Sequence, residues 1–360
     1  MIMAGGTGGH VFPGLSVAAA LRERGRGVIW LGTRRGLEAR VVPEHGIDIE
    51  WIAVAGLRGK GLVGTLTAPF RALFAVGQAL VVLRRRKPAA VLGMGGFVSG
   101  PGGLAAWLTR RPLVIHEQNA VAGTANRWLA RFATRVFEAF PASFPAGVAA
   151  DCVGNPVRRE IAALPPAAER IAARGAGTHA RRTRLLVVGG SLGARVLNVT
   201  VPAALAALPP ALRPEIRHQG GRLADEARAA YRDAGIEADV REFIEDMADA
   251  YGWADLVIGR AGALTIAELA AAGLPAVLVP YPHAIDDHQT ANAESFTAAG
   301  AGVVIAERDL DAARLAAAVR ALLEAPERLD AMAVNARRLA RVDAADRIAD
   351  ACIALAGGRR

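Results

Sequence analysis

The sequence predicts an α/β protein built from two doubly wound parallel sheets, and three observations support this. Short apolar runs alternate with helix-length amphipathic stretches through the first half of the 360-residue chain, and the same rhythm restarts near residue 184. The runs lack a polar face, which is typical of strands covered by helices on both sides. Glycine-rich turns follow three of them, as expected where a parallel strand leads into a helix.

The first half contains strand-like runs at residues 1–3, 28–31, 49–53, 89–92, 113–115 and 135–137. Helix-like stretches lie between them, at 14–24, 38–45, 62–84, 102–109 and 123–132. Because helix-length segments separate consecutive runs, the strands should be parallel and joined by crossovers. The first run is short, since typical strands contain ~5–6 residues.

A segment rich in Ala, Pro, Gly and Arg, residues 161–183, has no strand pattern and is interpreted as a helix and a linker. Beyond it, strand-like runs lie at 184–188, 215–218, 240–243, 256–258, 276–279 and 302–305, and the sequence from Leu310 onward is helical. Two domains are therefore expected, at 1–157 and 158–341.

The composition excludes several classes of protein. Hydrophobic residues make up 52% of the chain and charged residues 21%, so the chain is not disordered. Cys152 and Cys352 are far apart and lack metal-type spacing, so a disulfide framework and a zinc module are not expected. No basic region precedes the first apolar run, so we expect no signal peptide and a reducing, cytosolic location.

The net charge of +9 is confined to the first half of the chain. Residues 1–155 contain 18 Lys and Arg against 8 Asp and Glu, whereas the remaining residues contain 25 against 26. A basic half can bind nucleic acid, anionic lipid or a phosphorylated substrate. Solubility in an arginine-rich proteome explains it equally well.

Three glycine-rich loops follow predicted strands: GGTGGH at 5–10, GMGGFVSG at 93–100 and GGSLG at 189–193. Such turns aim backbone N–H groups and a helix dipole at an anion. Neither the first nor the third is a dinucleotide GxGxxG motif, and the absence of GxxxxGK[ST] argues against a P-loop NTPase. One loop could be only a tight turn, but three favour a phosphate-binding cleft between the domains.

Two side chains beside such loops could take part in chemistry. His10 ends the first loop and could accept a proton near neutral pH, although it could also be a packed residue at a helix start. Glu268 follows the loop at 259–262 in the first turns of the next helix. It could bind the two hydroxyls of a ribose or only complement the helix dipole.

Metal binding has weak support in the sequence. His283 and the Asp-Asp-His-Gln run at 286–289 could supply ligands. The one Asp-x-Asp triplet, Asp309 and Asp311, lies at a helix start, where capping explains it better.

These motifs together resemble the MurG family, the UDP-N-acetylglucosamine transferases that complete the lipid-linked peptidoglycan precursor. The matching segments are GGTGGHVFPG (5–14), GLRGKG (56–61), GMGGFVSGPG (93–102), HEQN (116–119), GNPVR (154–158), GGSLGA (189–194), EFIEDM (242–247) and GALT (262–265). The resemblance covers nearly the whole chain. This sequence departs from the family in its short first strand and in Asp287 and His288 before Gln289.

The resemblance implies the GT-B fold, in which two Rossmann-like domains enclose a deep cleft and a C-terminal helix, about 342–360, packs back on the first domain. The N-terminal domain would bind the acceptor and the membrane, and the C-terminal domain would bind UDP-N-acetylglucosamine. The implied donor contacts are Thr7, Gly8, Gly9, Asn119, Arg158, Ser191, Ile244, Ala263, Leu264, Thr265, Ile266, Ala267, Glu268 and Gln289. The acceptor pyrophosphate would contact Thr7, Gly8, Gly9, Gly95 and Gly96.

The implied reaction is an inverting transfer to the C4 hydroxyl of MurNAc-pentapeptide-pyrophosphoryl-undecaprenol, with UDP as the leaving group. A base must take the hydroxyl proton, and His10 is the candidate. Helix N-termini and Arg158 would stabilise the leaving group, so no metal ion and no other cofactor is expected.

Residues 57–87 contain seven cations and no acid, interleaved with apolar residues. The apolar run is too short to span a bilayer, which needs ~20 residues. We expect a peripheral contact with anionic lipids on the cytoplasmic face of the inner membrane, although an ordinary core-facing helix is the alternative. The expected membrane residues are Leu66, Phe70, Arg71, Leu73, Phe74, Arg84, Arg85 and Arg86.

Two other functions fit parts of the sequence. A UDP-sugar 2-epimerase, or a transferase with a different acceptor, would keep the fold but not the first-domain loops. A non-catalytic module that binds anionic lipid or nucleic acid would explain the basic half but not the motifs of the second half. We therefore expect no nucleic-acid partner.

Overall fold

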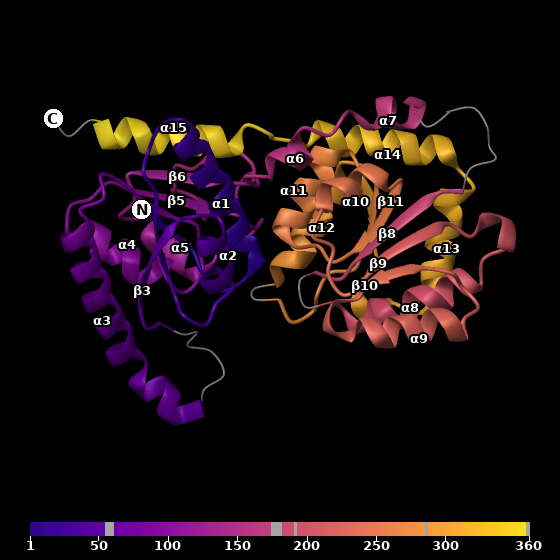
Figure 1. The fold of residues 1–360 in the computed structure, drawn as a ribbon, viewed down its shortest axis with the longest axis horizontal. Coiled ribbons are helices and arrows are strands. Elements are labelled where there is room, and N and C mark those ends of the chain that lie inside the picture. The colour runs from indigo at the N-terminus through magenta and orange to yellow at the C-terminus, as the bar shows by residue number, and fades with distance from the viewer. Residues whose placement is uncertain (55–60, 174–181, 191–192, 285–286, 358–360) are drawn as a thin grey trace. The chain divides into compact units, whose positions relative to one another are not determined.

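The computed structural model describes residues 1–54, 61–173, 182–190, 193–284 and 287–357, without the side chains of 61–68, 171 and 173. The chain forms two compact units (Figure 1). Unit 1 comprises Met1–Arg158 and Arg341–Arg360, and unit 2 comprises Arg159–Ala340.

Unit 1 is built on a parallel sheet with the strand order β3-β2-β1-β4-β5-β6-β7. Its strands are β1 (Ile2–Met3), β2 (Ile29–Gly32), β3 (Asp48–Trp51), β4 (Val91–Gly93), β5 (Leu113–Glu117), β6 (Arg135–Glu138) and β7 (Asp151–Cys152). Its helices are α1 (Gly8–Glu23), α2 (Glu38–Glu44), α3 (Gly61–Arg86), α4 (Ser99–Leu108), α5 (Thr124–Leu129) and α15 (Ala344–Gly357). All six predicted strands are confirmed, and the two-residue β7 was not predicted.

Unit 2 repeats the plan, with the parallel order β10-β9-β8-β11-β12-β13. Its strands are β8 (Arg184–Val188), β9 (Glu215–Gln219), β10 (Asp239–Arg241), β11 (Leu256–Gly259), β12 (Ala276–Leu278) and β13 (Gly302–Val304). Its α-helices are α6 (Arg159–Ala162), α7 (Ala167–Ala173), α8 (Arg195–Ala206), α9 (Ala224–Asp233), α10 (Met247–Trp253), α11 (Ala263–Ala272), α12 (His288–Ala298), α13 (Ala312–Leu323) and α14 (Pro326–Arg338). Short 3₁₀ turns lie at Pro210–Leu212, Gly221–Leu223 and Glu307–Asp309.

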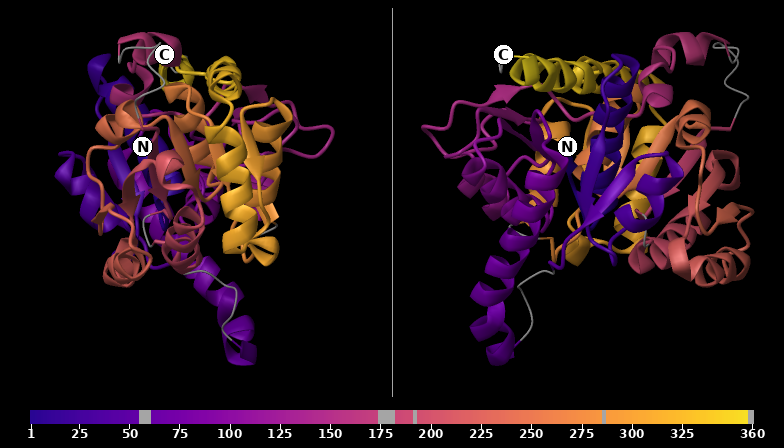
Figure 2. Two further views of the ribbon diagram at one scale, coloured as in Figure 1. Left: turned by 90° about the vertical axis from the view of Figure 1, so that its right-hand side faces the viewer. Right: turned by 60° about the vertical axis from the view of Figure 1, so that its left-hand side comes forward.

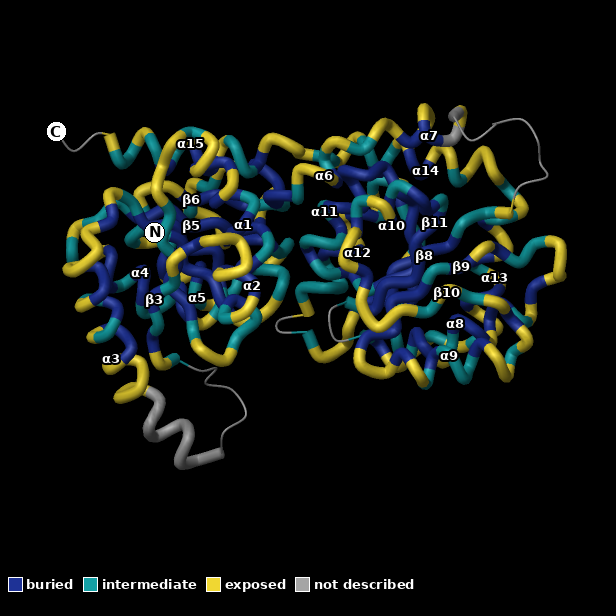
Figure 3. The backbone as a smooth tube through the Cα atoms, viewed as in Figure 1, coloured by how far each residue is buried: buried dark blue, intermediate teal, exposed yellow. Residues whose placement is uncertain are grey.

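Both strand orders place the first and fourth strands of a unit side by side at the sheet centre, which is the doubly wound plan predicted from the sequence. In such sheets ligands bind beyond the carboxyl ends of these strands, where the winding direction reverses. The glycine loops after β1, β4, β8 and β11 occupy those positions. Figure 3 shows the central strands of each unit as buried, whereas the edge strand β10 is partly exposed.

The first helix begins earlier than predicted. The expected range was 14–24, but α1 starts at Gly8 and includes three further glycine and proline residues. One of these glycines, Gly14, faces the sheet, and a Cβ built there would lie 2.6 Å from the ring of Trp30 on β2. A glycine in α1 therefore lets the helix pack closely on the sheet, which outweighs its low helix propensity.

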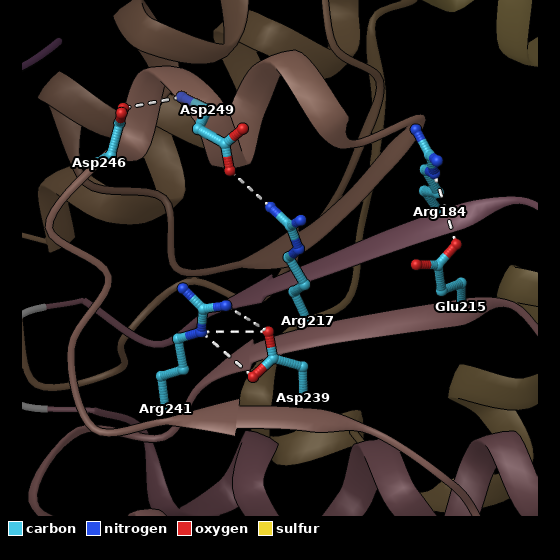
Figure 4. Close-up of polar contacts among 7 residues, drawn as sticks. All are labelled: Arg184, Glu215, Arg217, Asp239, Arg241, Asp246 and Asp249. Carbon is cyan, nitrogen blue, oxygen red and sulfur yellow. Dashed lines mark hydrogen bonds and ion pairs between the residues drawn. The ribbon is translucent and has the colours of Figure 1, made fainter. Parts of the chain in front are cut away.

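Charged pairs lie on the surface of the unit 2 sheet and at its edges (Figure 4). Arg217 pairs with Asp249 at 2.7 Å, and Arg241 pairs with Asp239 at 2.8 Å. Asp311 caps α13 by accepting a hydrogen bond from the N–H of Arg314 at 2.7 Å, as the sequence predicted. Exposed pairs contribute ~0–1 kcal/mol each, so the apolar core dominates stability.

Within the described residues, no helix is long and apolar enough to cross a membrane.

The C-terminal helix α15 packs against α1 in unit 1 (Figures 1 and 2). Ile348 and Cys352 of α15 are buried in one cluster with Val17 and Leu21 of α1. Arg24, one residue beyond α1, pairs with Asp346 of α15 at 2.8 Å. The last helix therefore completes the core of the first unit.

Truncation of Ile348 should destabilise unit 1. The side chain is fully buried, so Ile348→Ala removes its contacts and leaves a cavity, at a cost of about 2–5 kcal/mol in the free energy of unfolding. Val342→Ala, at an exposed position just before the same helix, is the control and should cost less than about 1 kcal/mol. Urea unfolding followed by hydrogen exchange in α1 measures both. Equal effects of the two substitutions would contradict the packing of α15 on unit 1.

Candidate active site

The loops after β1 and β4 touch through their backbones. A Cβ on Gly96 would lie 2.2 Å from the carbonyl oxygen of Gly5, and one on Gly95 would lie 2.7 Å from Nδ1 of His10. Both glycines also have positive φ, 89° and 77°. Only glycine fits at these two positions, so the two loops form a surface lined by backbone.

The residues predicted to bind the acceptor pyrophosphate lie together on this surface. Thr7 is the N-cap of α1, and Gly8 and Gly9 are its first two residues. The first N–H groups of a helix have no partner within the helix and carry its positive dipole end, which suits a phosphate. Gly95 and Gly96 approach the same helix start.

A buried carboxylate that the sequence reasoning missed holds the first loop. Glu38 accepts hydrogen bonds from the backbone N–H of Gly6 at 2.9 Å and from the N–H and hydroxyl of Thr33 at 2.9 and 2.7 Å. Its side chain is fully buried. Nothing in the sequence distinguishes it from an ordinary acid in the first turn of a helix.

His10 lies in the first turn of α1, half-buried, at the end of a chain of hydrogen-bonded side chains. Its Nδ1 is 3.0 Å from Oε1 of Gln118, and Nε2 of Gln118 is 3.0 Å from Nδ1 of His116. Nε2 of His116 is 2.9 Å from the carbonyl oxygen of Gly154. Burial lowers the pKa of His116 to about 4, so this ring is neutral near pH 7.

Asn119, expected to reach the donor sugar, is positioned by its neighbour Glu117. The carboxylate of Glu117 accepts from the backbone N–H of Asn119 at 2.9 Å and from its side-chain amide at 3.1 Å. It also accepts from Gly123 N–H at 3.1 Å and from Asn126 Nδ2 at 2.9 Å. In the HEQN motif, Glu117 therefore holds Asn119 in place, while His116 and Gln118 belong to the chain that ends at His10.

Arg158 is the last residue of unit 1 that the sequence predicted to contact the donor. Its guanidinium lies over the ring of Phe12 on α1, 5.7 Å from the centroid, which is a cation–π distance. The contact places Arg158 beside the helix that starts with the glycine loop.

In unit 2, Gln219 joins two of the predicted donor loops. Gln219 is the last residue of β9 and is buried. Its Nε2 donates to the carbonyl of Gly190 at 3.0 Å, and its Oε1 accepts from the N–H of Ile244 at 3.1 Å. Gly193 approaches as closely as the glycines of unit 1, since a Cβ there would lie 2.4 Å from the oxygen of Gly220. Ser191, expected at the donor phosphates, lies outside the described residues.

The start of α11 is another helix end at which an anion could bind. Gly262 is its N-cap, and Ala263, Leu264 and Thr265 form its first turn. Ile266 is buried and Ala267 half-buried, so only the backbone or edge of these two is available to a ligand.

Glu268 lies in the middle of α11 and not in its first turn. It is 4% exposed and accepts a hydrogen bond from the hydroxyl of Tyr251 at 3.2 Å. A buried carboxylate in mid-helix does not complement the helix dipole, so that alternative is wrong. Burying a carboxylate is unfavourable unless hydrogen bonds compensate it, so we interpret Glu268 as a hydrogen-bonding residue.

Gln289 on α12 has its carboxamide oxygen bonded to the N–H of Tyr281 at 3.0 Å. This contact leads the side chain back to the loop after β12. Among the residues that the structure describes, no cluster of three or more His, Cys, Asp or Glu side chains could hold a metal ion.

Comparisons with known proteins agree with this arrangement. Residues 1–138 match the glycosyltransferase family 28 N-terminal domain, and residues 184–348 match the family's C-terminal domain. A relative from Alkalilimnicola ehrlichii is 60% identical over 98% of both chains, and one from Nitrosococcus oceani is 56% identical over 99% of both. Each is named UDP-N-acetylglucosamine--N-acetylmuramyl-(pentapeptide) pyrophosphoryl-undecaprenol N-acetylglucosamine transferase.

Solved structures show the same fold. The MurG of Acinetobacter baumannii is 42% identical, covers 98% of this chain and 99% of its own, and has a TM-score of 0.84. The calicheamicin glycosyltransferase CalG4 is 18% identical with a TM-score of 0.67, a likeness of fold alone. On these matches, which cover both units, the chain belongs to glycosyltransferase family 28 and is a MurG-type N-acetylglucosaminyltransferase.

Proposed function

We propose that this enzyme transfers N-acetylglucosamine from UDP-N-acetylglucosamine to the C4 hydroxyl of MurNAc-pentapeptide-pyrophosphoryl-undecaprenol, with inversion and release of UDP. The observation that carries the proposal is the shared name of full-length relatives at 52–60% identity. The products are UDP and the completed lipid-linked precursor of peptidoglycan.

The two units divide the substrates between them. In unit 1 the helix start at Thr7–Gly9 and the loop at Gly95 and Gly96 would bind the acceptor pyrophosphate. In unit 2 the loop that Gln219 ties to Ile244, the start of α11 and Glu268 would bind the nucleotide of the donor. Arg158, Asn119 and Gln289 would contact the donor's phosphates and sugar.

His10 would act as the general base. It lies at the start of α1, beside the residues assigned to the acceptor pyrophosphate, and imidazole is suited to accept a proton near neutral pH. As the acceptor oxygen loses its proton to the ring, it forms the new bond to the anomeric carbon. The bond from that carbon to the UDP oxygen breaks on the opposite face.

The proposed base is tested by two substitutions of His10 in a transfer assay. His10→Ala and His10→Gln should both lower kcat by about 10²–10⁴-fold, because neither side chain can take the hydroxyl proton. The affinity for UDP, measured by calorimetry, should stay within about two-fold, since the nucleotide is assigned to unit 2. A near-parental kcat in His10→Gln would leave His10 with a positioning role only.

The assignment of Glu268 to the ribose is tested by Glu268→Gln. The substitution keeps the shape of the side chain but removes the charge that strengthens two hydrogen bonds to the ribose hydroxyls. We expect UDP affinity to fall by roughly 30-fold, or about 2 kcal/mol. Tyr251→Phe, which removes only the hydroxyl bonded to Glu268, is the control and should retain most of the affinity. Unchanged UDP binding in a Glu268→Gln protein with a parental Tm would contradict the assignment.

Transfer should need no metal ion. The proposed counter-charges for the leaving diphosphate are the helix starts of unit 2 and Arg158, which are permanent features of the protein. We expect kcat in excess EDTA to lie within about two-fold of its value in added magnesium. A rate that collapses in EDTA and returns with magnesium would overturn this part of the proposal.

We also propose that α3 attaches the enzyme to anionic lipid at the cytoplasmic face of the inner membrane, where the acceptor is anchored. The helix packs on α4 (Figure 1), and its buried apolar side is formed by Ala75, Val76, Ala79, Val82 and Leu83. Its opposite side is also apolar but exposed: Phe70 is 76%, Leu73 70% and Phe74 61% accessible to solvent, and Val81 63%. The core-facing alternative explains only the first side.

The cations near the end of α3 are not all available to lipid. Arg85 and Arg86 bind the carboxylate of Glu50 on β3, at 2.5 and 2.6 Å, and the Glu50 side chain is 10% exposed. Residues 57–87 contain no acid, but in the folded protein Glu50 lies beside this segment and neutralises part of its charge. Arg71 and Arg84 are exposed and flank the apolar side, which makes them the better probes. The side chain of Leu66 lies outside the described residues.

Charge reversal at Arg71 and Arg84 should weaken membrane binding. Each cation near an anionic surface contributes ~1 kcal/mol, so the double Glu variant should partition at least about 30-fold less onto phosphatidylglycerol vesicles. The control reverses Arg222 and Arg232, two exposed arginines of unit 2, and changes the net charge equally. If both double variants lose binding alike, net charge and not α3 governs attachment.

A further inference from the structure

We propose that Gln118 and His116 are positioning residues that hold His10 in the tautomer protonated at Nδ1, so that Nε2 is its proton-accepting atom. The proposal rests on the proposed role of His10 as the base. It assigns to the HEQN motif a function in unit 1 that is separate from the sugar contact of Asn119.

The direction of the hydrogen-bond chain is set at its inner end. A backbone carbonyl oxygen can only accept, so the nitrogen of His116 that lies 2.9 Å from the oxygen of Gly154 must donate. His116 is fully buried, and burial keeps its pKa near 4, so the ring has one N–H near pH 7. Its other nitrogen, Nδ1, therefore has a lone pair and accepts.

Gln118 transmits this direction to the active site. Only its amide nitrogen can donate to Nδ1 of His116, and the same nitrogen also lies 3.2 Å from the backbone oxygen of His116. The carboxamide oxygen must then face His10, from whose Nδ1 it is 3.0 Å away. An amide oxygen cannot donate, so Nδ1 of His10 does. A neutral His10 ring has no second proton, which leaves the lone pair on Nε2.

The reverse direction is excluded by the same contacts. If the Gln118 amide were turned over, its NH₂ would face His10 and its oxygen would face Nδ1 of His116. His116 would then need protons on both nitrogens, since Gly154 still requires a donor. A charged imidazole fully buried in this position is what the low pKa of His116 disfavours.

The surroundings leave the three side chains little freedom. Gln118 is 1% exposed, and its backbone oxygen accepts from Asn155 Nδ2 at 2.9 Å. Gly95 lies against the His10–Gln118 contact, where a Cβ would come within 3.3 Å of the Gln118 oxygen. Gly154 has φ 86° and packs against Arg341, which fixes its carbonyl. A base oriented through its second nitrogen by a third group is the arrangement that general-base catalysis by histidine requires.

Nitrogen-15 NMR of the full-length enzyme labelled at histidine tests the proposal directly. The couplings of the two ring nitrogens report which one carries the proton, and the resonances of His10 are those missing from His10→Gln. We expect the proton on Nδ1 in the parent. Gln118→Met, which has similar size but no strong donor or acceptor, and His116→Leu should both shift His10 toward the Nε2–H tautomer. His116→Leu is the more telling variant, because His116 reaches His10 through Gln118 in this hydrogen-bond chain and does not bond to it directly.

Kinetics give the second readout. The two variants should lower kcat by about 10–100-fold, which is part of the ~10²–10⁴-fold that a general base contributes, with UDP affinity within about two-fold of the parent. His218→Gln, which removes a buried histidine of unit 2 bonded to Tyr231 and Asn198, is the control and should leave the His10 tautomer unchanged.

The outcomes separate this inference from the role of His10. A parent enzyme with the His10 proton on Nε2 overturns the inference, even if His10→Gln is inactive, and so does an unchanged tautomer in both folded variants. Near-parental kcat in His10→Gln overturns the base assignment but leaves the tautomer measurement intact. Because the parent spectrum alone decides the tautomer, the test does not depend on either variant folding.

Discussion

The arrangement of the candidate site depends on backbone segments that approach more closely than any side chain allows. In unit 1 the loops after β1 and β4 touch at Gly5 and Gly96, and in unit 2 Gly193 meets the carbonyl of Gly220. These contacts bring helix starts to the carboxyl edge of each sheet. Their N–H groups can then contact a diphosphate directly, which suits an enzyme that handles one diphosphate in each substrate.

Buried polar side chains hold these loops in place. Glu38 binds the first loop of unit 1, Glu117 binds the segment around Asn119, and Gln219 spans two loops of unit 2. Burying such groups is unfavourable unless their hydrogen bonds are made, and here two or more are made by each. The same bonds order the loops before substrate arrives, so the binding groups need little rearrangement during transfer.

The sequence was sufficient to predict the strands, the doubly wound plan and the glycine loops, because these follow from local periodicity and from short motifs. It could not identify the bracing contacts. Gly6 and Glu38 are 32 residues apart, His116 and Gly154 are 38 apart, and Glu50 and Arg85 are 35 apart. Each is a tertiary contact between residue types that are also common on surfaces, so no spacing rule marks them. Glu268 was expected in the first turns of its helix, and only the structure shows that it is buried there and bonded to Tyr251.

The division between the units gives the enzyme two independent ways to lose activity. His10, its hydrogen-bond chain and the exposed apolar side of α3 all belong to unit 1, so the proposed base, the proposed acceptor contacts and the proposed membrane contact are built on the same sheet and its helices. Glu268 and Gln219 belong to unit 2, where Glu268 is bonded to Tyr251 of α10 and Gln219 joins two loops. Defects in the hydrogen-bond chain of His10 should therefore act on the chemical step and defects in α3 on access to the lipid-linked acceptor, whereas defects at Glu268 or Gln219 should act on nucleotide affinity.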